Sequence, residues 1–284
     1  MKKGIFVYPR YTALKSDNAF AWLHDEASLR GLSLEICFEE DCIIEYGEKT
    51  SISFGGRNMD DVSFVVMRTY NERISRYYEE KPGVYVVNSA EPMCVSKDKL
   101  LTHQVLHESG IPTPHTVYAP GAGYESISGI LGKKRFLVKQ INGSKGENIF
   151  LVEDSAQFDD AVLLLGKECI FQEFIDESYG RDIRVWVIGG QCVGSVLRYS
   201  ESSFLSNFSQ GGKFAAIDID DEASDLAVRA AAAVGLDFAG VDLLFCNGGY
   251  SVCEVNGNAG FRTISKSSEV SIPRCLFGFI ASVV

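Results

Sequence analysis

Short apolar runs alternate with an amphipathic segment over the first 90 residues. Four runs rich in Val, Ile and Phe predict buried strands: 4–8, 32–38, 62–67 and 84–88. The segment 18–30 spaces its apolar residues as a helix does and ends at Gly31. Strand–helix–strand order predicts a small α/β domain with a parallel sheet over residues 1–92.

In such a sheet, ligands bind where the strands end. The loops after Val7 and Met67 carry Arg10 and Arg68. We therefore expect Arg68 to bind a substrate carboxylate. The alternative is a surface arginine paired with Glu72, which is the common fate of an arginine.

The segment 96–99 is expected to open a helix whose body is 99–109. Ser96 is placed to cap its N-terminus, and Gly110 ends it. His103 and His107 are one turn apart, a spacing that can bind zinc. No third ligand follows in a recognisable pattern, so packing or surface histidines are the favoured interpretation.

Two strands, 135–139 and 149–152, flank a polar, glycine-bearing segment. Gly143 and Gly146 would let backbone N–H groups approach a phosphate closely, and Lys145 would add charge. The Walker A pattern is absent. A hairpin tip without a ligand is the alternative.

The next part of the chain predicts strands, a polar loop and two helices. The strands are 169–175, 181–187 and 191–199, the loop is 200–212, and the helices are 220–234 and 276–284. Alternation places Asp182 and Arg184 on one strand face, and Arg198 lies near a strand end. We expect the loop to belong to an active site.

The stretch 241–262 predicts a hairpin whose strands flank Asn247-Gly248-Gly249. In that register Asp242 faces Glu254 and Cys246 faces Tyr250, while Asn256 shares the face of Glu254. Carboxylate and amide oxygens are the ligands that Mg²⁺ prefers. The alternative is a hairpin whose polar residues simply face solvent.

Composition narrows the class of protein. A formal net charge of −11 argues against sequence-independent binding to nucleic acid or to an anionic membrane. We expect no transmembrane helix and no secretory signal, because no apolar run is long enough. The eight cysteines form no CxxC pair and predict reduced, structural thiols in a cytoplasmic protein.

The ordered motifs resemble the ATP-grasp superfamily and, within it, the RimK-like carboxylate–amine (alpha-L-glutamate) ligases. These motifs are KDK, the strand lysine with its glycine-bearing hairpin, QEFI, DIR, the loop with SN, AGVDLL and CEVN. The resemblance covers residues 84–275. It implies a mixed α/β and α+β fold with a small parallel-sheet pre-ATP-grasp domain (1–92), a central lid subdomain (93–172) and a C-terminal subdomain with the metal site (173–284).

The resemblance also implies the cofactors, ATP and Mg²⁺ with Mn²⁺ as a substitute, and a role for each motif. Phosphate contacts are implied for Lys99 and Lys139, a lid for Gly143, Ser144, Lys145 and Gly146, and adenine recognition for Gln172, Glu173, Phe174 and Ile175. The resemblance further implies that Asp182 lies near the ribose and that the Asn207 amide faces phosphate and metal. It implies that Arg198 stabilises an acyl phosphate and that the metal ligands are Asp242, Glu254 and Asn256.

The activity implied is ATP-dependent joining of a carboxylate to an amine through an acyl phosphate, with an amino acid such as glutamate added to a peptide, protein or small amine. Arg68, Arg184 and Arg262 are the predicted substrate-binding arginines. The chain departs from the family at Leu205, where an arginine is usual, and at 257–262, and both regions lie near where the substrate is expected to bind. Homo-oligomers are common in the family.

Three alternatives stay open. The first is a LysX-like or peptide-tailoring amino-acid ligase, and the second is a non-catalytic ATP-binding regulatory protein. The intact set of charged residues argues against the second, because a binding module has no need of a transfer apparatus. The third, a Rossmann dehydrogenase, lacks GxGxxG after its first strand, where Tyr8-Pro9-Arg10 stands.

Overall fold

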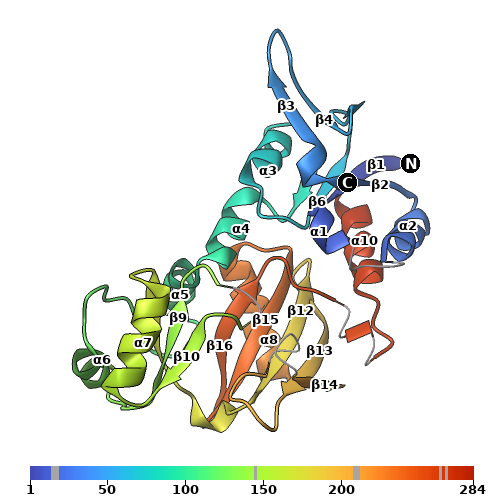
Figure 1. The fold of residues 1–284 in the computed structure, drawn as a ribbon. Coiled ribbons are helices and arrows are strands. Elements are labelled where there is room, and N and C mark those ends of the chain that lie inside the picture. The colour runs from blue at the N-terminus through green and yellow to red at the C-terminus, as the bar shows by residue number, and fades with distance from the viewer. Residues whose placement is uncertain (14–18, 144–145, 207–211, 262–263, 266–267) are drawn as a thin grey trace. The chain divides into compact units, whose positions relative to one another are not determined.

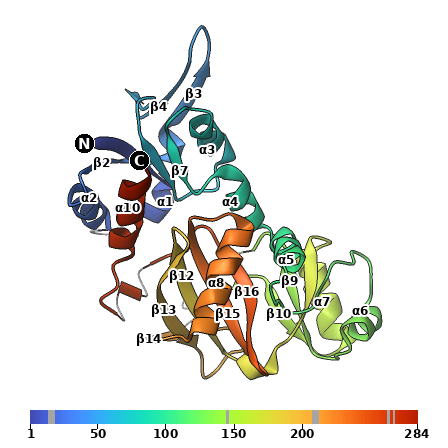
Figure 2. The same ribbon diagram turned by 180° about the vertical axis from the view of Figure 1, so that it is seen from behind.

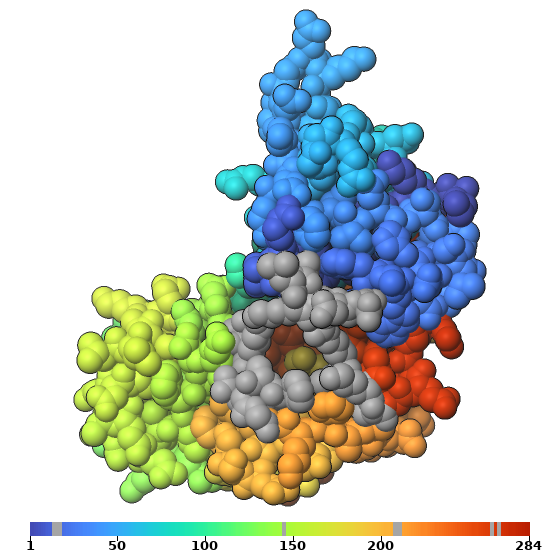
Figure 3. Space-filling model, turned by 45° about the vertical axis from the view of Figure 1, so that its right-hand side comes forward, coloured from blue at the N-terminus to red at the C-terminus, as the bar shows by residue number. Residues whose placement is uncertain are grey.

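The computed structural model describes residues 1–284 except 14–18, 144–145, 207–211, 262–263 and 266–267, which are drawn in grey in Figure 1 and Figure 3. The chain forms two compact units. The first comprises Met1–Cys94, Leu236–Phe238 and Val270–Val284, and the second comprises Val95–Gly235 and Ala239–Glu269. The division into three domains that the sequence suggests remains a prediction.

The first unit is built on a parallel sheet of order β2-β1-β6-β7, as expected from its strand–helix–strand pattern. A second, antiparallel sheet of order β3-β4-β5 projects from it (Figure 1). The elements are β1 (Lys2–Tyr8), α1 (Arg10–Ala13), α2 (Ala19–Ser28), β2 (Leu32–Phe38), the 3₁₀ turn η1 (Glu39–Asp41), β3 (Cys42–Tyr46), β4 (Thr50–Phe54), β5 (Arg57–Asn58), β6 (Phe64–Met67), α3 (Glu72–Glu79), β7 (Tyr85–Val87), α4 (Ala90–Lys97), which runs into the second unit, and α10 (Ile272–Val283).

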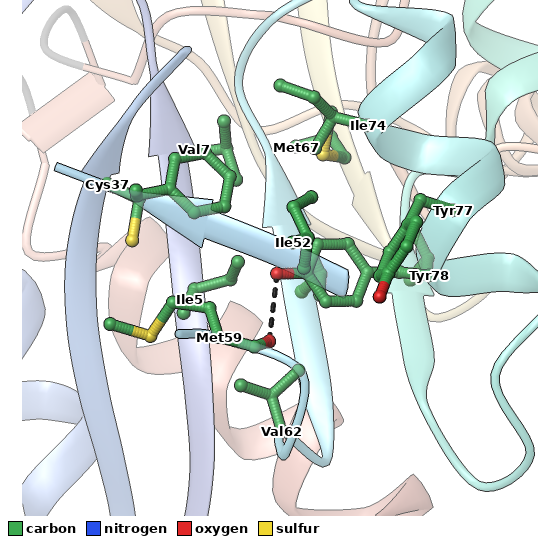
Figure 4. Packing of buried hydrophobic residues seen from close by; sticks show 13 residues of the cluster. Ile5, Val7, Cys37, Ile52, Met59, Val62, Met67, Ile74, Tyr77 and Tyr78 are labelled. Atoms are coloured by element: carbon green, nitrogen blue, oxygen red, sulfur yellow. Dashed lines mark hydrogen bonds between the residues drawn. The ribbon is translucent and has the colours of Figure 1, made fainter. Parts of the chain in front are cut away.

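The core of the first unit joins both of its sheets. Ile5 and Val7 of β1 pack with Ile52 of β4, and the Tyr78 hydroxyl donates to the Met59 carbonyl over 3.0 Å (Figure 4). The antiparallel sheet, which the sequence analysis did not predict, therefore completes this core instead of forming a separate appendage.

The second unit contains two sheets. One has the order β10-β9-β11-β8 and packs against α6 and α7, and the other has the order β14-β13-β12-β15-β16 with α8 across one face (Figure 2). The elements are α5 (Lys99–Glu108), β8 (Thr116–Val117), α6 (Tyr124–Leu131), β9 (Phe136–Gln140), β10 (Ile149–Val152), α7 (Ser155–Leu165), β11 (Cys169–Glu173), η2 (Asp176–Ser178), β12 (Arg181–Ile188), β13 (Gln191–Tyr199), β14 (Lys213–Ala216), α8 (Asp221–Val234), β15 (Phe238–Cys246) and β16 (Gly249–Asn256).

Two local predictions were wrong. The helix body begins at Lys99 as predicted, but its cap is not Ser96. The Asp98 carboxylate accepts from the Leu101 N–H and caps the helix, and Ser96 lies in α4. The final hairpin turns at Asn247-Gly248, so Cys246 pairs with Gly249 and not with Tyr250.

A β-bulge restores the register that the sequence predicted for the metal ligands. Asp242 pairs with Glu254 whereas Leu243 pairs with Val252, so Cys253 is the extra residue of β16. The predicted pairing of Asp242 with Glu254 is therefore confirmed, although the loop length assumed for it was wrong. None of the helices in the described ranges is both long and apolar enough for a membrane span.

Candidate active site

One cavity of the second unit gathers most of the predicted site residues. Its walls come from the two sheets and from the loops that follow β9, β11 and β13. The predicted residues that line it are Lys99, Lys139, Gly143, Gly146, Glu173, Phe174, Ile175, Asp182, Arg198, Asp242 and Glu254.

Arg198 is held in the cavity wall by an acid on each side. Its Nε and Nη2 donate to the two carboxylate oxygens of Asp182 over 2.6 and 2.7 Å, and its Nη2 lies 2.9 Å from Asp242 Oδ2. Ser206 Oγ donates to the same Asp182 carboxylate over 2.6 Å. Burial disfavours the charged guanidinium, but Asp242 and Asp182 outweigh that and raise the pKa of Arg198. A fixed cation therefore faces the cavity at every working pH.

Asp242 holds a second arginine. Nε and Nη2 of Arg184 each donate to an oxygen of Asp242 over 2.7 Å, a bidentate pair on a carboxylate that is only 2% exposed. Burial favours the neutral acid, but Arg184 and Arg198 outweigh it and keep the pKa of Asp242 below its usual value. Arg184, predicted to bind substrate, is thus positioned beside a predicted metal ligand.

The three predicted metal ligands offer the donor atoms that Mg²⁺ needs. Asp242 pairs with Glu254 and Gly240 with Asn256 in the β15–β16 ladder, so Asn256 lies two positions from Glu254 on β16. A carboxylate offers about four lone-pair sites, and guanidinium contacts use three of those on Asp242. Asn256 uses its Nδ2 on the Gly240 carbonyl at 3.5 Å, which leaves its amide oxygen for a cation. The set fits Mg²⁺.

Lys99 connects the glycine-bearing hairpin to this acidic group. Its Nζ donates to the Gly143 carbonyl over 2.7 Å and lies 3.6 Å from Glu254 Oε1. An ammonium at this position can exchange both partners for phosphate oxygens without leaving the cavity.

The strand predicted to recognise adenine divides its side chains between two environments. Gln172 is fully buried and accepts a hydrogen bond from Lys139 Nζ. Glu173 lies 2.8 Å from Lys133, so its side chain is already paired, and the Arg135 guanidinium lies 4.9 Å from the Phe174 ring centroid. Phe174 and Ile175 line the cavity with apolar surface.

Some predicted residues cannot be placed in this site. Arg68 belongs to the first unit, where it is buried with its guanidinium 5.0 Å from the Phe238 ring centroid. Ser144, Lys145, Asn207 and Arg262 lie outside the described residues.

Several cavity residues were not singled out by the sequence analysis. They are Leu137, Glu147, Ile149, Ser178, Arg181, Leu244 and Cys253, whereas Phe204, Leu205 and Ser206 belong to the loop 200–212 that was expected in an active site. Strand alternation gives a signal for two of them, since Leu137 lies two positions from Lys139 and Leu244 two from Asp242. No such signal exists for Cys253, which lies at the bulge, with its Sγ 3.8 Å from Lys139 Nζ.

The loop that carries Phe204 and Ser206 is anchored at Gly180. This glycine has a φ of +64°, and a Cβ atom there would lie 2.7 Å from the carbonyl oxygens of Ser200 and Ser203. The Gly180 N–H donates to the Phe204 carbonyl over 3.2 Å, and the Ser200 N–H donates back to the Gly180 carbonyl over 2.8 Å. Only glycine fits so close to this loop.

Solved structures define the class of protein to which this fold belongs. The ATP-grasp ligase PsnB, solved with a minimal precursor, superposes with a TM-score of 0.75 at 22% identity, covering 100% of this chain and 99% of that one. The D-cycloserine synthetase DcsG superposes with a TM-score of 0.72 at 17% identity, covering 99% of both chains. The fold is that of the ATP-grasp ligases.

Sequence comparison identifies the family. The model of the RimK-like ATP-grasp domain matches residues 96–280, and the chain belongs to this family. A protein named probable alpha-L-glutamate ligase from Maridesulfovibrio salexigens is 32% identical over 99% of this chain and 95% of its own length. Human N-acetylaspartylglutamate synthase A is 32% identical over 72% of this chain and 54% of its own length.

Proposed function

We propose that the protein is an ATP- and Mg²⁺-dependent ligase that joins a carboxylate to an amine, with glutamate as one of the two substrates. The observation that carries this proposal is the convergence of Lys99, Lys139, Arg198, Asp242 and Glu254 on a single cavity. Glutamate is proposed because it appears in the names of both the bacterial and the human relatives.

The charged residues suit phosphoryl transfer. The substrate carboxylate attacks the γ-phosphorus of ATP, the bond to the β,γ-bridging oxygen breaks, and an acyl phosphate and ADP result. Lys99 and Lys139 would hold the phosphates, and Arg198 would stabilise charge on the transferred group. Asp242, Glu254 and Asn256 would hold Mg²⁺, which neutralises phosphate charge when bound.

The second step needs no nucleophile from the protein. The amine nitrogen attacks the acyl carbon, the C–O bond to phosphate breaks, and the amine proton leaves with phosphate or solvent. Water competes with the amine for the acyl phosphate, so the role proposed for Gly143 and Gly146 is to close the cavity during this step. Cys253 lines the cavity, but burial raises the pKa of its thiol, which makes it a poor nucleophile.

Substrate-dependent ADP release tests the proposal. Purified protein with Mg-ATP is supplied with glutamate together with a panel of small amines, small carboxylates and short peptides, and ADP and phosphate are both measured. We expect release of both products to depend on glutamate and one partner, with the amide found by mass spectrometry. Tight ATP binding without turnover on the whole panel would instead favour a binding module.

A further inference from the structure

Gln172 lies at the centre of a buried hydrogen-bond network behind the cavity. Its amide oxygen accepts from Lys139 Nζ, and its amide nitrogen lies 2.8 Å from both His103 Nε2 and Thr116 Oγ1. His103 comes from α5, Thr116 from β8 and Lys139 from β9, so three other elements meet at this one amide of β11.

The chemistry of the partners fixes the direction of each hydrogen bond. An ammonium only donates, so the oxygen of the Gln172 amide must face Lys139, and its NH₂ group faces His103 and Thr116. The Thr116 hydroxyl donates to the Pro114 carbonyl over 2.9 Å and is free to accept from Gln172. His103 must therefore accept through an unprotonated Nε2, with its proton on Nδ1.

The surroundings of His103 keep the imidazole neutral. The side chain is 6% exposed, and burial together with the nearby Lys139 and Lys99 ammonium groups lowers its pKa to about 3. A protonated ring would place an N–H against the Gln172 NH₂ group and would turn the amide, so that Lys139 would lose its acceptor.

A histidine at position 103 is energetically unfavourable if its role is packing alone. Its Nδ1 is buried with no hydrogen-bond partner among the described residues, which disfavours the fold because the group loses its hydration. An apolar side chain of similar size would fill the same space without that cost. The benefit of a histidine here is its Nε2 acceptor.

We propose that His103 is a positioning residue, which fixes the Gln172 amide so that its oxygen holds the Lys139 ammonium at the phosphate end of the cavity. An ammonium has three donors, so Lys139 can contact Gln172 and Cys253 and still donate to a phosphate. The inference rests on the proposed function, because Lys139 is assigned to the nucleotide there.

Two replacements of His103 separate positioning from packing. His103→Leu removes the acceptor and keeps an apolar side chain, whereas His103→Gln places an amide oxygen near the position of Nε2. We expect His103→Leu to raise the dissociation constant and the KM for Mg-ATP about tenfold, with the KM for glutamate unchanged. His103→Gln should restore ATP affinity to within about threefold of the wild type. His107→Leu, one turn further along α5 and exposed, is the matched control.

A double-mutant cycle tests whether His103 acts through Lys139. In a Lys139→Met background, His103→Leu should cause no further loss of ATP affinity, measured by calorimetry. Equal ATP affinity in His103→Leu and the wild type, an equal loss in His103→Leu and His103→Gln, or additive losses in the cycle would overturn the inference. His103→Met is the second apolar variant if His103→Leu does not fold. A wild-type protein that binds no Mg-ATP would instead overturn the proposed function.

Discussion

At the scale of single residues, the two candidate carboxylate ligands of the metal, Asp242 and Glu254, differ in burial and in their ion-pair partners. Asp242 is buried between Arg184 and Arg198, whereas the Glu254 side chain is 26% exposed and lies 3.6 Å from Lys99. Removing the charge of Asp242 would leave two guanidiniums under-compensated, and breaking such a buried pair costs about 3–5 kcal/mol. A loss of activity in Asp242→Asn would therefore not distinguish loss of the metal from misfolding.

Glu254→Gln is the cleaner test of the metal site. We expect ADP release to fall about 10²–10³-fold and the Mg²⁺ concentration for half-maximal activity to rise, because one anionic ligand is lost. Its free energy of unfolding, measured in urea, should change by less than about 1 kcal/mol, because the Lys99–Glu254 pair is long and only partly buried. Equal destabilisation of Glu254→Gln and Asp242→Asn would contradict this assignment of roles.

His103 gives the protein a specific sensitivity to acid. Its pKa is about 3 in the fold and about 6.5 in the unfolded chain, so below pH 6.5 the unfolded state binds the extra proton. Stability is therefore lost as the pH falls from 6.5 towards 3, at about 1.4 kcal/mol per pH unit. When the pH is lowered from 7.5 to 5, the free energy of unfolding measured in urea should fall by about 2 kcal/mol less in His103→Leu than in the wild type. An identical loss in both proteins would show that the ring is protonated without penalty.

What could be predicted at this scale was the facing of residues in one hairpin. The hairpin register paired Asp242 with Glu254, and the family resemblance selected Lys139 and Arg198. The partners of these residues come from distant positions. Gln172 of β11 lies next to His103 of α5 only through the tertiary fold, and that contact has no signature in the local pattern of either segment.

At the scale of elements, the loop after β13 depends on one glycine. Gly180→Ala would force a φ of +64° on alanine and drive its Cβ to 2.7 Å from two carbonyl oxygens. Gly132 has a φ of +65° with nothing within 4 Å of the same atom, so Gly132→Ala carries the conformational cost without the clash.

Comparing Gly132→Ala with Gly180→Ala predicts that only the second substitution affects the cavity. Gly132→Ala should lower stability by about 1–2 kcal/mol and leave the KM for ATP unchanged. Gly180→Ala should lower stability by more and should also raise the KM for ATP several-fold, because the displaced loop carries Phe204 and Ser206. Equal KM values in the two variants would show that the loop does not shape the nucleotide site.

The elements themselves were predictable where their periodicity was long. The strands of the parallel sheet and helix α8 were confirmed from their apolar patterns. The small sheet of β3, β4 and β5 was missed because its strands are at most five residues long and expose Ile43 and Tyr46. Short strands with mixed faces give little periodic signal.

On the scale of the whole molecule, the order of elements along the chain does not reveal which unit each element belongs to. The last helix, α10, was expected to pack on a core, but sequence order gave no reason to place it in the first unit. There Ser271 donates to Glu26 over 3.0 Å, and Phe279 lies edge-on to Tyr85 at 6.0 Å between centroids. Such a return of the chain depends on contacts between distant residues, 245 positions apart for Ser271 and Glu26, which local patterns do not encode.

The placement of α10 leads to a prediction about unfolding. Phe277 is fully buried on α10, and Phe277→Ala should destabilise the first unit by about 3–5 kcal/mol through the cavity it leaves. Val283→Ala, at an exposed position of the same helix, is the control and should change stability by less than about 0.5 kcal/mol. Under the proposed function Mg-ATP binds the folded second unit, so it should raise the unfolding temperature of that unit. In calorimetry, Phe277→Ala should lower the temperature of one unfolding transition, and Mg-ATP should leave the temperature of that same transition unchanged. A single transition that responds to both would show that the two units unfold as one.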